Sequence, residues 1–126
     1  MKSKNNRLEL TGYTTVRKFA GYALPVPVQN LLLRGYCDEH NFNYRLPLVE
    51  IDLPNNYMFL HTTIDRCSKS ANIGMCSIYM FPRETEKFLS LKTKIDKKKL
   101  RFHFIFENCV ITSDELAEFY YNSRLR

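Results

Sequence analysis

The chain has 126 residues, of which 44% are hydrophobic and 25% charged, with a formal net charge of +6 and a pI near 9.2. These values are ordinary for one globular domain with one hydrophobic core. No apolar run approaches the length of about 18 residues that a membrane-spanning helix needs. The basic start, Met1–Arg7, does not lead into the apolar core of a signal peptide, so we expect a cytoplasmic protein.

Metal and redox chemistry have no motif in this chain. The cysteines Cys37, Cys67, Cys76 and Cys109 form no CxxC pair and have no accompanying His pair, so we expect four reduced thiols, mostly buried. The three histidines are dispersed, and their spacing supports no Ser-His-Asp or Cys-His arrangement. The GxGxxG and GxxxxGK[ST] patterns are both absent. We therefore expect no cofactor and no metal.

The first half of the chain predicts two strand–helix units. The apolar segment Val16–Leu24 is typical of a strand and is stopped by Pro25. A helix is expected over about Pro27–His40, where apolar residues recur at helical spacing. A second strand over about Tyr44–Leu53 and a second helix over about Asn56–Ser68 follow.

The second half predicts two more units. Ile73–Phe81 is nearly continuously apolar, as parallel strands covered on both faces are. Pro82 begins a third helix, and the lysines Lys97–Lys99 complement the dipole at its end, so this basic run is interpreted as a helix terminus. Leu100–Ile111 contains the fourth strand, and Thr112–Glu115 has the spacing of a capping box that opens a last helix.

This alternation predicts an α/β fold. We expect a single open, mostly parallel four-stranded sheet, (βα)4, flavodoxin-like or half-Rossmann, with strand order 2-1-3-4 and helices on both faces. Residues 16–126 would form this domain. Residues 1–15 would be an N-terminal extension that either adds an antiparallel strand or stays loose. Ligands of such sheets bind beyond the carboxyl ends of the strands, which selects the candidate site residues.

Three candidates for chemistry follow the third and fourth strands. Glu107 comes after apolar strand residues, where a carboxylate is costly to bury without a partner or a task. It is therefore either a general acid or base, or a structural partner of Arg34 or Arg83. Ser77 and Tyr79 interrupt an apolar strand, and they are either polar contacts of a site or satisfied hydroxyls of the core.

Five further residues are candidates for substrate binding. Gln29 and Asn30 open the first helix, whose free N–H groups attract anions, so both are either ligand contacts or caps. Arg34 lies one turn later and would approach the same rim. Asp52 ends the second strand, where it also suits a turn, and Asn108 ends the fourth.

Several segments resemble a family of small bacterial proteins, the sporadic carbohydrate cluster family. They are Gly21-Tyr22, Pro27–Cys37, Tyr57–Leu60, Cys76–Pro82 and Phe106–Asn108, in matching order over residues 21–108. The resemblance implies a place in the synthesis of surface polysaccharide or lipopolysaccharide and implies no established reaction.

A second resemblance concerns the fold alone. The first strand, its following Gln-containing helix and the apolar third strand look like the catalytic domain of serine recombinases, which carries Tyr-x-Arg-x-Ser at the end of its first strand. The stretch here is Tyr22–Val26, so Leu24 and Val26 replace the arginine and the nucleophilic serine. Recombination chemistry is therefore not carried over.

These observations lead to one main hypothesis and one alternative. The main hypothesis is a small enzyme or enzyme subunit that acts on a sugar, sugar phosphate or nucleotide sugar by cofactor-free acid/base chemistry, as an isomerase, epimerase or dehydratase (a lyase). Glu107 would be the acid/base group, with Ser77 and Tyr79 beside it. The alternative is a non-catalytic binding module, either a partner of a biosynthetic enzyme or a degenerate recombinase-like nucleic-acid binder.

Partners follow from the same residues. Basic residues beside aromatic ones, as in Arg101–Phe104, have the period of a strand with buried rings, which is a weak signal for nucleic acid. The basic chain ends are interpreted as solvated surface. We expect a sugar-type ligand, no nucleic acid, and a homo-oligomer or a complex with another biosynthetic enzyme.

Overall fold

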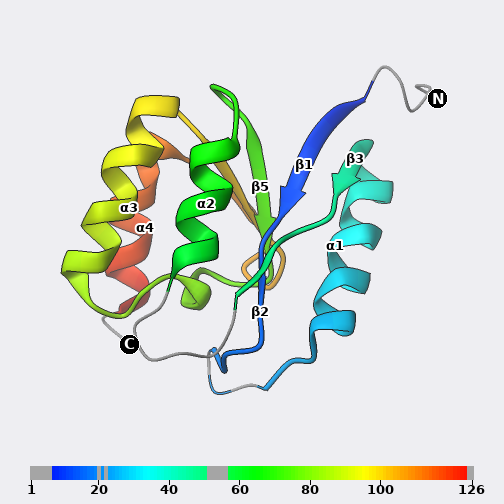
Figure 1. The fold of residues 1–126 in the computed structure, drawn as a ribbon, viewed down its shortest axis with the longest axis horizontal. Helices are drawn as coiled ribbons and strands as arrows, with labels where there is room; N and C mark the ends of the chain where they lie inside the picture. Colours follow the sequence, from blue (N-terminus) through cyan, green and yellow to red (C-terminus); the bar gives the residue numbers. More distant parts are fainter. Residues whose placement is uncertain (1–6, 20, 22, 51–56, 125–126) are drawn as a thin grey trace.

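The computed structural model describes residues 7–19, 21, 23–50 and 57–124 (Figure 1). Its strands are β1 (Leu8–Gly12), β2 (Thr14–Thr15), β3 (Phe42–Arg45), β4 (Val49–Glu50), β5 (Asn72–Met75), β6 (Arg101–Phe104) and β7 (Cys109–Thr112). Its helices are α1 (Val26–His40), α2 (Met58–Arg66), the 3₁₀ turn η2 (Ile78–Met80), α3 (Thr85–Lys98) and α4 (Ser113–Arg124).

The main sheet confirms the predicted fold class. Its five strands have the order β3-β1-β5-β6-β7, in which the first four are parallel and β7 is antiparallel to β6. A second, two-stranded parallel sheet pairs β2 with β4. The chain is therefore an open, mostly parallel α/β fold of flavodoxin-like or half-Rossmann arrangement, with one antiparallel edge strand more than expected.

The first strand is not where we predicted it. Residues 16–24 form no strand in the part that the structure describes, and β1 instead pairs in parallel with both β3 and β5. Residues 8–12, which we predicted to lie in an N-terminal extension, thus form a central strand of the sheet. The sequence did not predict this strand because the polar residues Glu9 and Thr11 alternate with its two leucines. In the structure Leu10 is buried and Leu8 is 68% exposed.

Two other predicted strands are divided. The second is split into β3 and β4, and its last residues, 51–53, lie outside the described residues. The fourth is a hairpin, because the chain turns between β6 and β7 and Asn108 adopts the left-handed conformation with φ 53°. The third is shorter than expected, since the backbone enters η2 after Met75.

The helices lie on both faces of the sheet, as predicted. In Figure 1, α1 lies on one side and α2, α3 and α4 lie on the other. On the α1 side, Leu10 and Leu33 pack against Gly74, where an added Cβ would lie 2.5 Å from a methyl carbon of Leu10. On the other side, Phe102 and Phe104 belong to the large core beneath the three helices. The absence of a side chain at Gly74 lets α1 approach the sheet closely.

Two predicted helix ends are confirmed. Glu115 Oε1 accepts hydrogen bonds from Thr112 Oγ1 at 3.0 Å and Thr112 N at 3.3 Å, so the predicted capping box opens α4. Lys97 and Lys98 lie in the last turn of α3, as predicted. Among the described residues, no helix has the length and hydropathy needed to cross a membrane.

Candidate anion-binding pocket

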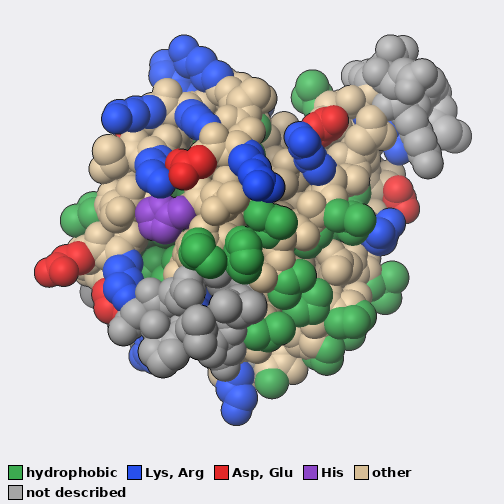
Figure 2. Space-filling view, in the orientation of Figure 1, with side chains coloured by type: hydrophobic (Ala, Val, Ile, Leu, Met, Phe, Trp, Pro, Cys, Tyr) green, Lys and Arg blue, Asp and Glu red, His purple; other side chains and the backbone are tan. Residues whose placement is uncertain are grey.

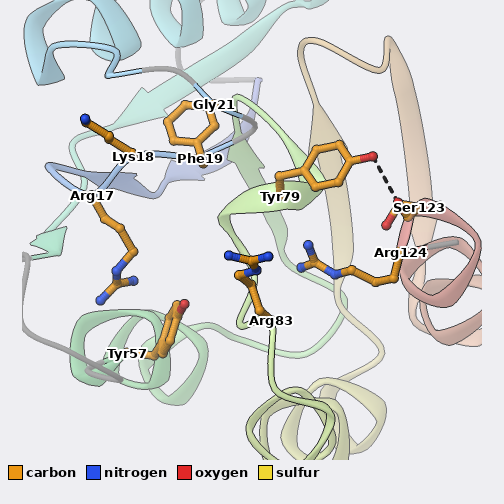
Figure 3. Close-up of a pocket in the computed structure, with 9 residues that line it drawn as sticks. All are labelled: Arg17, Lys18, Phe19, Gly21, Tyr57, Tyr79, Arg83, Ser123 and Arg124. Atoms are coloured by element: carbon orange, nitrogen blue, oxygen red, sulfur yellow. Dashed lines mark hydrogen bonds between the residues drawn. The ribbon is translucent and has the colours of Figure 1, made fainter. Parts of the chain in front are cut away.

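A cavity of about 410 Å³ opens where the parallel strands β2 and β5 end (Figure 3). Its described lining comes from the segment after β2, the start of α2, the segment after β5 and the end of α4. These lining residues are Arg17, Lys18, Phe19, Gly21, Tyr57, Tyr79, Arg83, Ser123 and Arg124. The cavity, called the basic pocket below, lies at the carboxyl edge, where parallel sheets bind ligands.

Cationic side chains predominate in the described lining of the basic pocket. Four of its lining side chains are cationic, namely Arg17, Lys18, Arg83 and Arg124, and no carboxylate, histidine or cysteine lines it among the described residues. Figure 3 shows the guanidinium groups of Arg83 and Arg124 pointing toward each other. Like charges held close together repel, and an anion placed between them relieves that repulsion.

Arg124 is held in place by neutral groups. Its Nη2 donates to the carbonyl oxygens of Phe81 at 3.2 Å and Pro82 at 3.3 Å. Its guanidinium carbon lies 4.7 Å from the ring centroid of Tyr120 and 5.4 Å from that of Tyr79. Carbonyls and ring faces fix the fork without cancelling its charge, so the arginine is pre-organised to bind an anion.

The Tyr57 ring also carries an arginine. The guanidinium carbon of Arg17 lies 4.2 Å from the ring centroid of Tyr57. The Tyr79 hydroxyl donates to the Ser123 carbonyl oxygen at 3.0 Å. Each of the two tyrosines thus has an arginine over its ring, so these faces support cations more readily than they stack a base. The pocket suits a phosphate group better than a nucleobase.

The structure brings the three predicted catalytic residues together, at the turn after β5. Ser77 Oγ donates to Glu107 Oε2 at 2.8 Å, the Ile78 backbone N–H donates to Glu107 Oε1 at 3.0 Å, and the Tyr79 backbone N–H donates to Ser77 Oγ at 3.1 Å. The predicted pairing of Glu107 with an arginine is not among its described contacts. Both carboxylate oxygens hold the turn, only Tyr79 lines the basic pocket, and a catalytic role for the three stays a prediction.

Gln29 ties α1 to β2. Its side chain is buried, Nε2 donates to the carbonyl oxygens of Thr15 at 2.7 Å and Leu24 at 2.8 Å, and Oε1 accepts from Thr15 N at 3.1 Å. The amide satisfies three backbone groups and so has a structural task, but this is not the helix cap that was one of the two alternatives, because α1 has no side-chain cap hydrogen bond. A binding role for Gln29 stays a prediction.

Three further predicted binding residues, Asn30, Arg34 and Asn108, are not in the described lining of the pocket. Asn30 Oδ1 accepts from the Tyr44 hydroxyl at 2.7 Å, and the Arg34 guanidinium carbon lies 5.5 Å from the Tyr44 ring centroid. Asn108 is an exposed turn residue of the β6–β7 hairpin. Asp52 lies outside the described residues. Binding roles for these residues stay predictions.

Sequence reasoning missed most of the basic pocket. Arg17 was assigned to a strand because the first strand was misplaced, and Arg124 was assigned to a solvated chain end. Arg83 was considered only as a partner of Glu107. The doublet Arg17-Lys18 after a strand was an available signal, whereas nothing in the sequence shows that the end of α4 reaches the same cavity.

The thiols and histidines offer no second reactive centre in the described part of the chain. The four cysteines are free, and burial raises the pKa of Cys37 to about 11 and of Cys76 to about 12, with Glu107 adding to the latter shift. These thiols stay protonated at neutral pH. No group of three or more His, Cys, Asp or Glu side chains is placed to hold a metal among the described residues.

Comparison with known proteins relates the fold to a recombinase. No protein-family profile matches the chain, and no curated protein matches it. Among solved structures, it is similar to the N-terminal catalytic domain of TP901-1 integrase, with a TM-score of 0.62 and 14% identity over 92% of this chain and 96% of that domain. The chain shares the fold of that catalytic domain. The resemblance to the sporadic carbohydrate cluster family is thus without support, and that to recombinase catalytic domains holds for the fold.

This likeness corrects the functional hypothesis. The predicted role in carbohydrate, polysaccharide or lipopolysaccharide biosynthesis, with its isomerase or lyase activity, is wrong, because the matching fold is a recombinase catalytic domain. The fold agrees better with the alternative, a non-catalytic module of recombinase-like fold, than with carbohydrate chemistry.

The position of β1 changes which residues follow the first strand. Because β1 ends at Gly12, the residues at its end are Tyr13–Arg17 rather than Tyr22–Val26. This stretch does not carry Tyr-x-Arg-x-Ser either, because Thr15 and Arg17 are its third and fifth residues. The serine is absent in either register.

Proposed function

We propose that this chain is a non-catalytic module of recombinase fold that binds the phosphate backbone of nucleic acid through the basic pocket. The observation that carries the proposal is the gathering of four cationic side chains, without a described carboxylate, at the ligand-binding edge of the sheet. The fold shared with an integrase catalytic domain supports nucleic acid as the source of the phosphate.

Binding is favoured over catalysis by the chemistry of the lining. A general base or a nucleophile would have to come from a carboxylate, histidine, cysteine or activated hydroxyl. None of the first three lines the pocket among the described residues. The Tyr79 hydroxyl donates to the Ser123 carbonyl oxygen, and the Ser123 hydroxyl donates to the Tyr120 carbonyl oxygen. The segment 13–19, which follows β1 and lines the pocket with Arg17, Lys18 and Phe19, contains no serine, so it adds positive charge to the pocket and no serine nucleophile.

Backbone recognition is favoured over base recognition by the arginine geometry. Guanidinium groups match phosphate oxygens with two parallel hydrogen bonds. Phosphate contacts position a protein on nucleic acid but carry no sequence information. We therefore expect an affinity that depends steeply on salt and little on base sequence.

Fluorescence anisotropy with labelled DNA of two unrelated sequences tests the proposal. Arg83→Gln removes one exposed charge from the pocket, and Arg34→Gln removes one exposed arginine from α1 as a matched control. The R83Q variant should bind both sequences about fivefold to tenfold more weakly than wild type. The R34Q variant should lose much less affinity. Equal losses of affinity in the two variants would show that only the overall charge matters and would refute DNA binding in the basic pocket.

A further inference from the structure

A second basic hollow lies along α2, at the other edge of the sheet. Two neighbouring cavities between α2 and strands β1 and β3 share the lining residues Thr11, Arg45 and Cys67, and we treat them together. The larger of the two extends to Arg7 and to the turn that contains Lys69. We call this hollow the α2 groove.

The α2 groove is also positive. Four cations line it, namely Arg7, Arg45, Arg66 and Lys69, against one described carboxylate, Glu9. Glu9 pairs with Arg45 at 3.3 Å, which leaves the other three cations without an ion pair among the described residues. Figure 2 shows Lys and Arg side chains gathered on the upper part of this face, over the end of α2 and the strands beside it.

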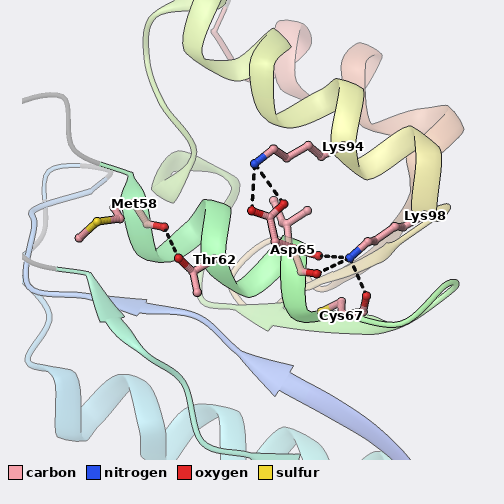
Figure 4. A network of polar contacts seen from close by, with 7 residues as sticks. Met58, Thr62, Asp65, Cys67, Lys94 and Lys98 are labelled. Atoms are coloured by element: carbon pink, nitrogen blue, oxygen red, sulfur yellow. Dashed lines mark hydrogen bonds and ion pairs between the residues drawn. The ribbon is translucent and has the colours of Figure 1, made fainter.

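The end of α2 would ordinarily oppose an anion here. The last carbonyls of a helix carry partial negative charge. In this chain Lys98 Nζ donates to the carbonyl oxygens of Ile64 at 2.9 Å, Asp65 at 2.6 Å and Cys67 at 2.7 Å (Figure 4). The Asp65 carboxylate is itself paired with Lys94 at 3.0 Å. The negative groups at this helix end are therefore neutralised from α3, and the groove keeps its positive charge.

We propose that the α2 groove is a second contact for the nucleic acid bound at the basic pocket, so that the ligand is a polymer that spans both ends of α2. The inference rests on the function proposed above. Tyr57, which lines the pocket, immediately precedes α2, and Arg66, which lines the groove, is the last residue of that helix. The nine residues of α2 span about 14 Å. One strand of a duplex places a phosphate about every 3.4 Å, so about four nucleotides cover that distance.

The two sites make different demands on ligand length. A dinucleotide reaches the pocket alone, whereas a strand of about 12 nucleotides reaches both sites. Removing charge from the groove with R66Q/K69Q should therefore weaken binding of the longer oligonucleotide about tenfold and leave the dinucleotide unchanged. The charge-retaining variant R66K/K69R is the matched control and should bind both lengths as wild type does.

Anisotropy competition with thymidine oligonucleotides of about 2 and about 12 nucleotides performs the test on the full chain. Wild-type affinity of R66Q/K69Q for the longer strand would overturn the groove contact. If R83Q still bound that strand weakly, the pocket function would survive this failure. Absence of binding at both lengths in wild type would overturn both proposals. If R66K/K69R bound the longer strand as weakly as R66Q/K69Q does, the loss of affinity would come from side-chain shape rather than charge. That result would also contradict the groove contact.

Discussion

Replacing Lys98 with methionine should destabilise the domain by removing the ammonium that joins α3 to the end of α2. The ammonium donates to three carbonyl oxygens, at 2.6 to 2.9 Å. Methionine keeps the apolar part of the side chain, so the change isolates the charged hydrogen bonds. Lys97, one residue earlier and exposed, provides a control for loss of charge in the same helical turn.

The size of the effect follows from which carbonyls water can reach. The bond to the Asp65 carbonyl is exposed, so water replaces it at little cost, whereas those to Ile64 and Cys67 are partly buried. Each carbonyl left partly unsatisfied costs about 1 kcal/mol, and loss of the favourable helix-end charge adds about 0.5 kcal/mol. We expect K98M to lower the free energy of unfolding by about 2 to 3 kcal/mol.

Circular dichroism during thermal and urea unfolding measures this difference. For a domain of this size about 2 to 3 kcal/mol corresponds to a fall in Tm of roughly 10 °C. The K97M control should remain within about 0.5 kcal/mol of wild type. Equal transitions in K98M and K97M would refute the reasoning, because they would mean that the three bonds contribute nothing beyond surface charge.

Three further predictions concern the opposite face of the sheet. Gly74→Ala should destabilise by about 1 to 3 kcal/mol, because its Cβ would lie 2.5 Å from a methyl of Leu10. Gly35→Ala, exposed within α1 with nothing within 4 Å, should stabilise by about 1 kcal/mol, and urea titration of both checks the signs. Burial, followed by the charges of His40 and Arg101, lowers the pKa of His103 to about 4, so its neutral form stabilises the fold fully above pH 6.5 and this contribution is lost as pH falls toward 4. Wild type should lose about 3 kcal/mol more than H103Q over that range, and parallel pH profiles of unfolding would contradict this.

The contacts of His103 explain why it is buried in the neutral form. Asn72 Oδ1 lies 2.9 Å from Nε2 and can only accept, so Nε2 carries the proton and Nδ1 accepts from the Tyr36 hydroxyl at 2.6 Å. Protonation of Nδ1 would break the second bond. The sequence placed His103 correctly in a strand, but only the fold reveals these partners.

Much of the architecture was readable from the sequence because its signals are local. The helix that begins near Pro27, the capping box at Thr112 and the lysine-rich end of α3 each depend on residues within one or two turns. The position of the first strand was predicted wrongly because its pairing with β3 and β5, rather than its own hydrophobicity, makes this segment a strand. Glu9 is exposed and Thr11 is only partly buried beside the α2 groove, so a central strand tolerates them here, and Glu9 pairs with Arg45 across the β1–β3 ladder.

The candidate site was less readable because it is assembled from distant segments. Arg17 and Arg124 line one cavity although more than a hundred positions separate them in the sequence. Glu107 was singled out correctly as a carboxylate that needs partners, but its partners are a serine hydroxyl and a backbone N–H. A hairpin turn at Asn108, and not a strand end, places that carboxylate against the turn after β5.

The salt dependence of DNA affinity tests the central claim most directly. Each phosphate neutralised by the protein contributes about −0.9 to the slope of log K against log salt for duplex DNA. Wild type should show a steep negative slope, and R83Q a slope shallower by about 1, with little dependence on sequence in either protein. A wild-type affinity insensitive to salt, or identical slopes for wild type and R83Q, would contradict phosphate binding in the basic pocket.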